Sequence, residues 1–281
     1  MKYSIPFFIL FSFITTISFS QNTNEIKSTI SKNVSTIEKE FLIPELNNIS
    51  HKIWVYLPPN YYESLKKYPV IYMHDGQNLF DNKTSYIGEW EVDETLNKLF
   101  NKTGKGFIVV GIENGGEERI NEYTPWKNKK YGGGKGAIYI NFLVNTLKPY
   151  IDSNYRTKKS AKHTAIIGSS LGGLISYYGG LKYPAVFGKI GALSTSFWFS
   201  NKVIDFTKKH GNTSKLKLYL YVGSKEDDTM ESDTKNMKNL LLASGFPAKN
   251  IKVSVNPIGK HNETAWKSEF LEVVKWLYAI K

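Results

Sequence analysis

Gly168-Ser169-Ser170-Leu171-Gly172 is the most informative segment of this sequence. It follows an apolar run with strand character, Thr164-Ala165-Ile166-Ile167, and precedes Gly173 to Tyr178, which can begin a helix. A serine with glycine two positions to either side fits a sharp strand-to-helix turn, because side chains at those positions would collide with the strand and the helix. Such a turn exposes the hydroxyl of Ser170 as a nucleophile. The alternative is a glycine-rich turn with a bystander serine.

The N-terminal region predicts export. The chain has 281 residues and begins with Met1-Lys2, an apolar run from Ile5 to Phe19, and Ser18-Phe19-Ser20 before Gln21. A charged start, an apolar core and a small-x-small site are typical of a signal peptide over residues 1–20 that is cleaved after Ser20. We therefore expect a periplasmic or secreted protein without a stable membrane anchor; the alternative is an uncleaved anchor.

The remaining composition narrows the class of protein. There is no cysteine, which excludes disulfides, thiol nucleophiles and thiolate metal sites. The formal net charge is +12, but the lysines are scattered and no nucleic-acid motif accompanies them. We interpret the charge as a solvated, lysine-rich surface, expect no nucleic-acid partner, and find nothing that calls for a cofactor or a metal. The oligomeric state is not indicated.

Apolar runs alternate with helical patterns along the rest of the chain. Residues 21–35 are polar and predict a flexible leader, and residues 36–281 predict one domain. We expect two early antiparallel strands at Ile37–Ile43 and Ile53–Leu57, followed by strands over 69–73, 106–111, 164–167, 190–193 and 216–222. Helical spacing appears over 90–100, 138–151, 230–242 and 264–278. This alternation predicts an α/β fold with a mostly parallel central sheet and helices on both faces.

A serine nucleophile needs a base and an acid. Of the five histidines, only His210 and His261 follow Ser170. His210 lies in a basic, polar stretch, whereas His261 lies in a loop before the last helix, and we predict His261 as the base. The loop after residues 218–222 supplies the acid, but spacing does not choose among three adjacent carboxylates, Glu226, Asp227 and Asp228. The order serine, acid, histidine is that of α/β-hydrolases.

An oxyanion site needs two backbone N–H groups. The N–H of Leu171 follows the predicted nucleophile at a helix N-terminus. The loop from His74 to Asp81 offers the second, at Gln77, because Gly76 permits a tight turn there. The alternative for this loop is an ordinary Asp-Gly turn.

Several motifs together resemble the Putative esterase family of α/β-hydrolases, which includes feruloyl, acetyl-xylan and enterobactin esterases. The resemblance runs from about Lys52 to Trp276. Besides the serine segment, it rests on Trp54–Tyr61, His74–Asp81, Gly111–Gly115, Arg119 with Glu122–Trp126, Leu147–Asp152 with Tyr155–Thr157, Gly223–Glu226 and His261–Trp266.

The resemblance implies a serine esterase that acts through an acyl-enzyme. It implies Ser170, His261 and, three residues after the strand-ending Gly223, Glu226 as the triad. It also implies that the pocket contains Asn114, Arg119, Tyr123 and Trp198. Trp198 packing in the core and a structural Arg119–Glu122 pair are the alternatives. The implied substrate is a glycan-linked acyl or feruloyl ester or a siderophore trilactone; an acyltransferase and a non-catalytic binding protein are the alternative functions.

Overall fold

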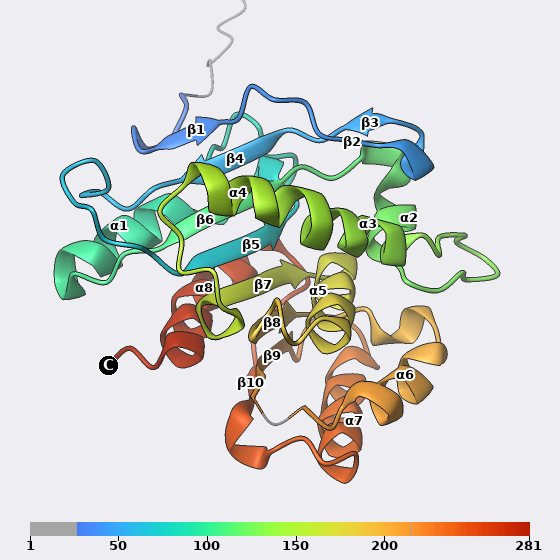
Figure 1. Cartoon of the computed structure of the whole chain (residues 1–281). Helices are drawn as coiled ribbons and strands as arrows, with labels where there is room; N and C mark the ends of the chain where they lie inside the picture. The colour runs from blue at the N-terminus through green and yellow to red at the C-terminus, as the bar shows by residue number, and fades with distance from the viewer. Residues whose placement is uncertain (1–26, 214) are drawn as a thin grey trace, which may run out of the picture.

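A computed structural model describes residues 27–213 and 215–281 (Figure 1). The predicted signal peptide therefore lies outside the described residues. None of the helices in the described ranges combines the length and apolar character that a membrane crossing needs.

The centre of the molecule is an eight-stranded sheet. Its strands, in spatial order, are β1 (Val34–Thr36), β4 (Ile53–Tyr56), β6 (Ile108–Ile112), β5 (Val70–His74), β7 (Thr164–Ser169), β8 (Lys189–Leu193), β9 (Lys217–Gly223) and β10 (Ile251–Asn256). All strands from β6 to β10 are parallel, whereas β4 is antiparallel to both β1 and β6. The predicted mostly parallel sheet with antiparallel N-terminal strands is confirmed.

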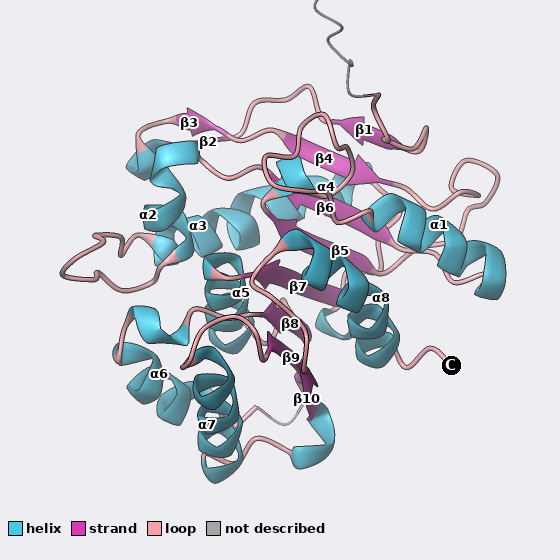
Figure 2. Cartoon of the chain, turned by 180° about the vertical axis from the view of Figure 1, so that it is seen from behind, coloured by secondary structure: helices cyan, strands magenta, loops and turns pink. Residues whose placement is uncertain are grey.

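Helices cover both faces of the sheet. One face carries α1 (Val92–Thr103) and α8 (Glu263–Tyr278), seen from their side in Figure 2. The other carries α3 (Gly136–Phe142), α4 (Lys148–Asn154), α5 (Leu171–Lys182), α6 (Lys202–His210) and α7 (Met230–Ala243) (Figure 1). Successive residues of β5 alternate between the two cores: Ile71 and Met73 pack toward α1 and α8, and Tyr72 packs toward the opposite face. This alternation explains why the central strands are apolar throughout.

The first predicted strand, Ile37–Ile43, is wrong. The strand at the sheet edge is β1, and residues 37–41 belong to no strand. Charged residues at 38–40 are exposed, so the chain leaves the sheet after the N–H of Ile37 bonds the carbonyl of Ile53. Further on, β2 (Leu42–Ile43) pairs with β3 (Ile49–Ser50) in a separate two-stranded sheet.

The described end of the predicted leader is bonded to the domain. The Ser28 hydroxyl donates to Asp81 Oδ2 at 2.7 Å, and the Ser31 N–H donates to Asp93 Oδ2 at 2.8 Å. Residues 28–31 of the predicted leader therefore lie against the loop before α1 and the first turn of that helix.

The predicted helix over 138–151 continues further than expected. The helical stretch runs through α3, a π-helical turn over Leu143–Leu147, and α4, which ends at Asn154. Pro149 is the second residue of α4, directly after the π-helical turn, and the helical stretch continues past it to Asn154. α6 and β10, and the short α2 (Arg119–Tyr123), were not predicted as separate elements.

Candidate active site

Ser170 occupies a strained turn between β7 and α5. Its backbone has φ 58° and ψ −123°, a region that non-glycine residues rarely adopt. The Ser170 N–H donates to the Leu193 carbonyl at 2.9 Å, and its own carbonyl accepts from the Leu174 N–H at 3.1 Å. Bonds to both β8 and α5 therefore hold this conformation and place the serine at the carboxyl edge of the parallel strands.

The glycines around Ser170 differ in how little space they leave for a side chain. A Cβ at Gly168 would lie 2.5 Å from the Gly172 carbonyl oxygen, so the strand and the helix meet too closely there for any side chain. A Cβ at Gly172 would come no closer than 3.3 Å, to Asp75 Oδ2. The tighter helical position is Gly173, where it would lie 2.9 Å from the Leu193 carbonyl oxygen. The steric collision that the sequence predicts at Gly172 is therefore found at Gly173 instead.

His261 is paired with a buried carboxylate. Its Nδ1 lies 3.0 Å from Glu226 Oε2; the Glu226 side chain is fully buried, and that of His261 is 38% exposed. Asp227 instead accepts the N–H groups of Thr229 and Met230, at 2.8 and 2.9 Å, where α7 begins. Of the three carboxylates that spacing left open, Glu226 alone hydrogen-bonds His261 within the described ranges.

The second oxygen of Glu226 is also fixed. Glu226 Oε1 accepts from the Ser194 hydroxyl and from the Gly223 N–H, both at 2.6 Å. The Ser194 oxygen in turn accepts from Trp266 Nε1 at 2.7 Å. A buried carboxylate with all these donors is held in one orientation. Sequence reasoning missed Ser194, because no motif contains it.

Ser170 and His261 line the same pocket, whose volume is about 360 Å³. The Ser170 Oγ lies 3.4 Å from the Ser196 Oγ, and no Ser170–His261 hydrogen bond occurs among the described side chains. Nucleophile–base bonds are often long in ligand-free enzymes and tighten around the substrate. The geometry therefore places the two groups at one cavity without locking them together.

Two backbone N–H groups are available near the serine. Leu171 begins α5 and Gln77 belongs to the 3₁₀ turn Gly76–Asn78, so neither N–H has an acceptor within its own helix. Gln77 lines the pocket, and Leu171 follows Ser170 directly. A Cβ at Gly76 would lie 2.7 Å from the Gly111 backbone, so this glycine lets the turn lie against β6.

Asp75 lines the same pocket and holds two of its neighbours in place. Arg119 binds it with two hydrogen bonds, Nε to Oδ1 at 2.7 Å and Nη2 to Oδ2 at 2.9 Å, and Asn114 Nδ2 donates to Oδ1 at 2.6 Å. Burial opposes the charge of Asp75, but the Arg119 guanidinium and these bonds together lower its pKa. Asn114 and Arg119 line the pocket, and part of their donor capacity is used by Asp75.

Two of the predicted pocket residues lie elsewhere. Tyr123 is fully buried, and its hydroxyl accepts the Asp75 N–H at 3.0 Å from beneath the site. Trp198 is 46% exposed, contacts the Tyr131 ring edge-on at 5.8 Å, and lines a separate pocket beside α6 and α7. The alternative pairing of Arg119 with Glu122 is also absent among the described residues, because Glu122 Oε1 binds His51 Nε2 at 2.6 Å.

Apolar side chains at the pocket rim were not predicted. Tyr86 and Ile87 line the pocket and are 85% and 78% exposed, and Trp90 lies deeper and is buried. Tyr86 and Ile87 lie in the loop before α1, which has no recognisable motif. The rim offers an apolar surface to a substrate at the mouth of the pocket.

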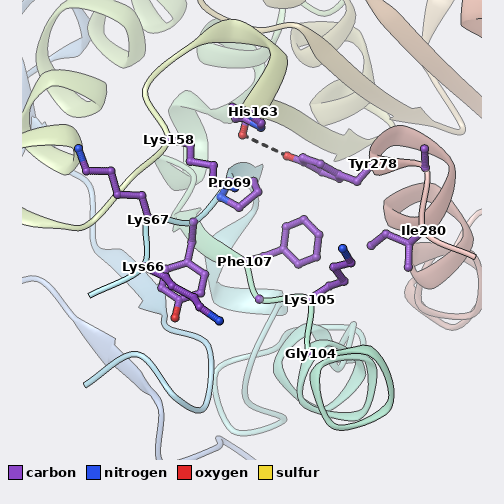
Figure 3. A pocket seen from close by; sticks show the side chains of 13 residues that line it. Lys66, Lys67, Pro69, Gly104, Lys105, Phe107, Lys158, His163, Tyr278 and Ile280 are labelled. Atoms are coloured by element: carbon purple, nitrogen blue, oxygen red, sulfur yellow. Dashed lines mark hydrogen bonds between the residues drawn. The ribbon is translucent and has the colours of Figure 1, made fainter. Parts of the chain in front are cut away.

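A larger cavity of about 520 Å³ lies at the other end of the strands (Figure 3). It is lined by residues that precede β5, β6 and β7, such as Pro69, Phe107 and His163, and by Tyr278 at the end of α8. Its lining contains lysines and aromatic rings but no serine and no carboxylate. The chemistry needed for acyl transfer is therefore at the smaller pocket.

The sheet order and the strained serine turn after β7 define the class: this is an α/β-hydrolase. The chain belongs to the Putative esterase family, whose model matches residues 45–277, and it is accordingly a carboxylic ester hydrolase.

Individual relatives agree with this family. The chain is 28% identical over 242 residues to the uncharacterized protein YbbA of Bacillus subtilis, covering 82% of this chain and 93% of that one. It is 27% identical over 205 residues to an endo-1,4-beta-xylanase/feruloyl esterase of Xylanibacter ruminicola, covering 70% of this chain and 25% of that protein.

Solved structures share the fold at lower identity. A ferulic acid esterase superposes with a TM-score of 0.65 at 18% identity, covering 89% of this chain and all of the other. The enterobactin esterase FES of Shigella flexneri superposes with a TM-score of 0.68 at 16% identity, covering 90% and 61%.

Proposed function

We propose that this esterase uses Ser170, His261 and Glu226 as a catalytic triad and passes through an acyl-serine intermediate. The observation that carries the proposal is the pairing of His261 Nδ1 with Glu226 Oε2 at the pocket that contains Ser170. With Nδ1 held by the carboxylate, Nε2 is the nitrogen left to exchange a proton with substrate and serine.

In the first step, the Ser170 Oγ attacks the ester carbonyl carbon while its proton moves to His261 Nε2. Glu226 orients the ring and stabilises the imidazolium. The N–H groups of Gln77 and Leu171 donate to the oxyanion; losing one such donor typically costs about 3 kcal/mol of barrier. The intermediate collapses as His261 protonates the departing alcohol oxygen. Water then attacks the acyl-serine carbonyl while one of its protons moves to His261 Nε2. His261 returns this proton to the Ser170 Oγ as the acyl–oxygen bond breaks, which releases the acid and restores the free serine.

For the substrate, we propose a glycan-linked acyl or feruloyl ester or a siderophore trilactone. The relatives named for feruloyl and enterobactin esterase activity support this class, and the apolar rim of Tyr86 and Ile87 suits an aromatic acyl group. We also propose that residues 1–20 direct export, so that the enzyme meets such an ester outside the cytoplasm.

The test is hydrolysis of p-nitrophenyl acetate, methyl ferulate, acetylated xylan and enterobactin by the purified protein. We expect Ser170→Ala to lower kcat by about 10⁴-fold or more on every accepted ester. Ser169→Ala is the matched control, since Ser169 ends β7 and is expected to keep activity within a few fold. Full activity in Ser170→Ala would overturn the proposed nucleophile.

A further inference from the structure

Three carboxylates gather around the start of α1, outside the catalytic constellation. Glu89 precedes the helix, and Asp93 and Glu94 lie in its first turn. Each offers an oxygen, and these oxygens lie within 4.8 Å of one another. Asp93 is fully buried and the other two are half-buried. Acidic residues in a first helical turn are often stabilised by the helix dipole alone, so the grouping by itself indicates no ligand.

The hydrogen bonding of these carboxylates is incomplete. Glu89 Oε1, Asp93 Oδ1 and Glu94 Oε2 are buried, and among the described residues no donor outside the cluster bonds them; Asp93 and Glu94 lie close enough to share a proton. None of the ion pairs found within 27–213 and 215–281 involves the three residues. Burying an unpartnered carboxylate oxygen is costly, so three in one place require positive charge or protons from outside the set.

Bonds from outside the cluster orient two of its members. Glu89 Oε2 accepts from the Thr29 hydroxyl at 2.7 Å, and Asp93 Oδ2 accepts from the Ser31 N–H at 2.8 Å. Each bond fixes one oxygen of its carboxylate, and the other oxygen receives no hydrogen bond from a donor in the part of the chain that the structure describes. Metal-binding carboxylates are commonly held in this way, by outer hydrogen bonds that aim the remaining oxygen at the ion.

We propose that Glu89, Asp93 and Glu94 bind one divalent cation of the calcium type. Ca²⁺ binds oxygens at 2.3–2.6 Å, so a single ion reaches oxygens up to about 5 Å apart, and the oxygens of this cluster, all within 4.8 Å of one another, lie inside that reach. Mg²⁺ gives up its bound water molecules reluctantly and is seldom held by protein carboxylates alone, so a set made only of carboxylates favours Ca²⁺. An all-carboxylate set also disfavours zinc and copper, which prefer nitrogen or sulfur ligands.

The ion has a structural role in this arrangement. It ties the start of α1 to the preceding loop, which carries Tyr86 and Ile87 at the pocket rim, and Thr29 and Ser31 extend the tie to the N-terminal segment. The sequence contains no pattern that predicts a metal, and the site is independent of the proposed triad. Its test therefore uses binding and stability and does not depend on activity.

The experiment is calorimetric titration of the chelator-treated full chain with CaCl₂ at pH 7.5, with thermal unfolding at 5 mM CaCl₂, at 5 mM MgCl₂ and in EDTA. We expect one Ca²⁺ per chain and a Tm several degrees higher with Ca²⁺ than in EDTA, with a smaller Mg²⁺ shift. Glu94→Gln should weaken Ca²⁺ binding at least tenfold and remove the Tm shift. Glu91→Gln is the matched control, because Glu91 is paired with Lys267 at 3.0 Å outside the cluster and should keep both responses.

Two results would overturn the proposal. One is a wild-type chain with no Ca²⁺ heat and no Tm shift, which would mean that the carboxylates share protons. The other is an equal Ca²⁺ response in the wild type, Glu94→Gln and Glu89→Gln, which would place the cation elsewhere. Glu89→Gln also serves as the second variant should Glu94→Gln fail to fold, since Glu89 lies outside the helix.

Discussion

Glu226 and the Glu89–Asp93–Glu94 cluster are two buried acidic regions of the molecule, and they are built in opposite ways. Both oxygens of Glu226 accept hydrogen bonds, from His261, Ser194 and Gly223. In the cluster, each carboxylate has one buried oxygen to which no donor among the described residues bonds. Burial alone therefore does not assign a role to an acid. Donors of the protein itself satisfy Glu226, whereas the proposed site takes its positive charge from a cation in solution.

The largest expected effect comes from removing the charge of Glu226 while keeping its shape. Glu226→Gln should lower kcat by about 10³- to 10⁴-fold, because an amide no longer holds His261 in the required tautomer or stabilises its charged form. Steady-state kinetics on p-nitrophenyl acetate measure this. A loss of kcat below tenfold would show that Glu226 has a structural role only, and that its complete hydrogen bonding does not mark a catalytic acid.

A smaller effect should follow from removing one donor to Glu226. Ser194→Ala should lower kcat about tenfold, since Glu226 Oε1 loses a hydrogen bond, and should cost about 1–3 kcal/mol of stability because the Trp266 N–H loses its acceptor. In a Glu226→Gln background, the same substitution should change kcat little. Equal losses in both backgrounds would mean that Ser194 does not act through Glu226.

The cluster should respond to pH in the opposite sense to Asp75. Burial and the neighbouring Asp93 raise the pKa of Glu94 to about 8, so the metal-free folded state holds its proton more tightly than the unfolded chain does. That contribution to stability is complete below pH of about 4.5 and is lost as pH rises toward 8. The pKa of Asp75 is lowered, so its contribution is present at neutral pH and is lost in acid.

Urea unfolding in EDTA at pH 5 and pH 8 measures this difference. We expect Glu94→Gln to reduce the loss of stability between the two pH values, and Glu91→Gln to leave it unchanged. If the free energy of unfolding depends on pH in the same way in wild type and Glu94→Gln, then Glu94 ionises without a cost in stability. The cluster would then not differ from Glu226 in needing an outside source of positive charge.

The smallest effect on catalysis is expected at the carboxylate next to Glu226. Asp227→Ala should keep kcat within about twofold and lower stability by about 1 kcal/mol, because Asp227 bonds the backbone at the start of α7 and not His261. Activity and urea unfolding on the same preparation separate the two outcomes. A hundredfold loss of kcat would move the acid from Glu226 to Asp227.

The features that could be predicted from the sequence are those that a local residue pattern determines. Continuous apolar runs predicted the central strands, and the glycines around Ser170 predicted the turn. Chain order brought His261 to the site, whereas Glu226 was separated from Asp227 and Asp228 only by family resemblance. In the structure, Glu226 hydrogen-bonds His261, and Asp227 bonds the backbone at the start of α7 instead.

The missed features depend on contacts between distant segments. Ser194 has no motif, and its role as a donor arises only where β8, the loop after β9 and α8 converge. Tyr123 was expected in the pocket but supports it from below, which a linear pattern does not distinguish. In sequence, Glu89, Asp93 and Glu94 look like an ordinary acidic helix start. Their unpartnered oxygens appear only once residues 28–31 pack against them.

Ser170 is proposed as a nucleophile activated by a histidine that Glu226 holds in place. The decisive experiment is reaction with diisopropyl fluorophosphate, followed by intact-protein and peptide mass spectrometry. We predict one phosphoryl adduct per chain, located on Ser170, absent in Ser170→Ala and formed at least a hundredfold more slowly in Glu226→Gln. An adduct on another residue, or a folded wild-type chain that stays unmodified, would contradict the account.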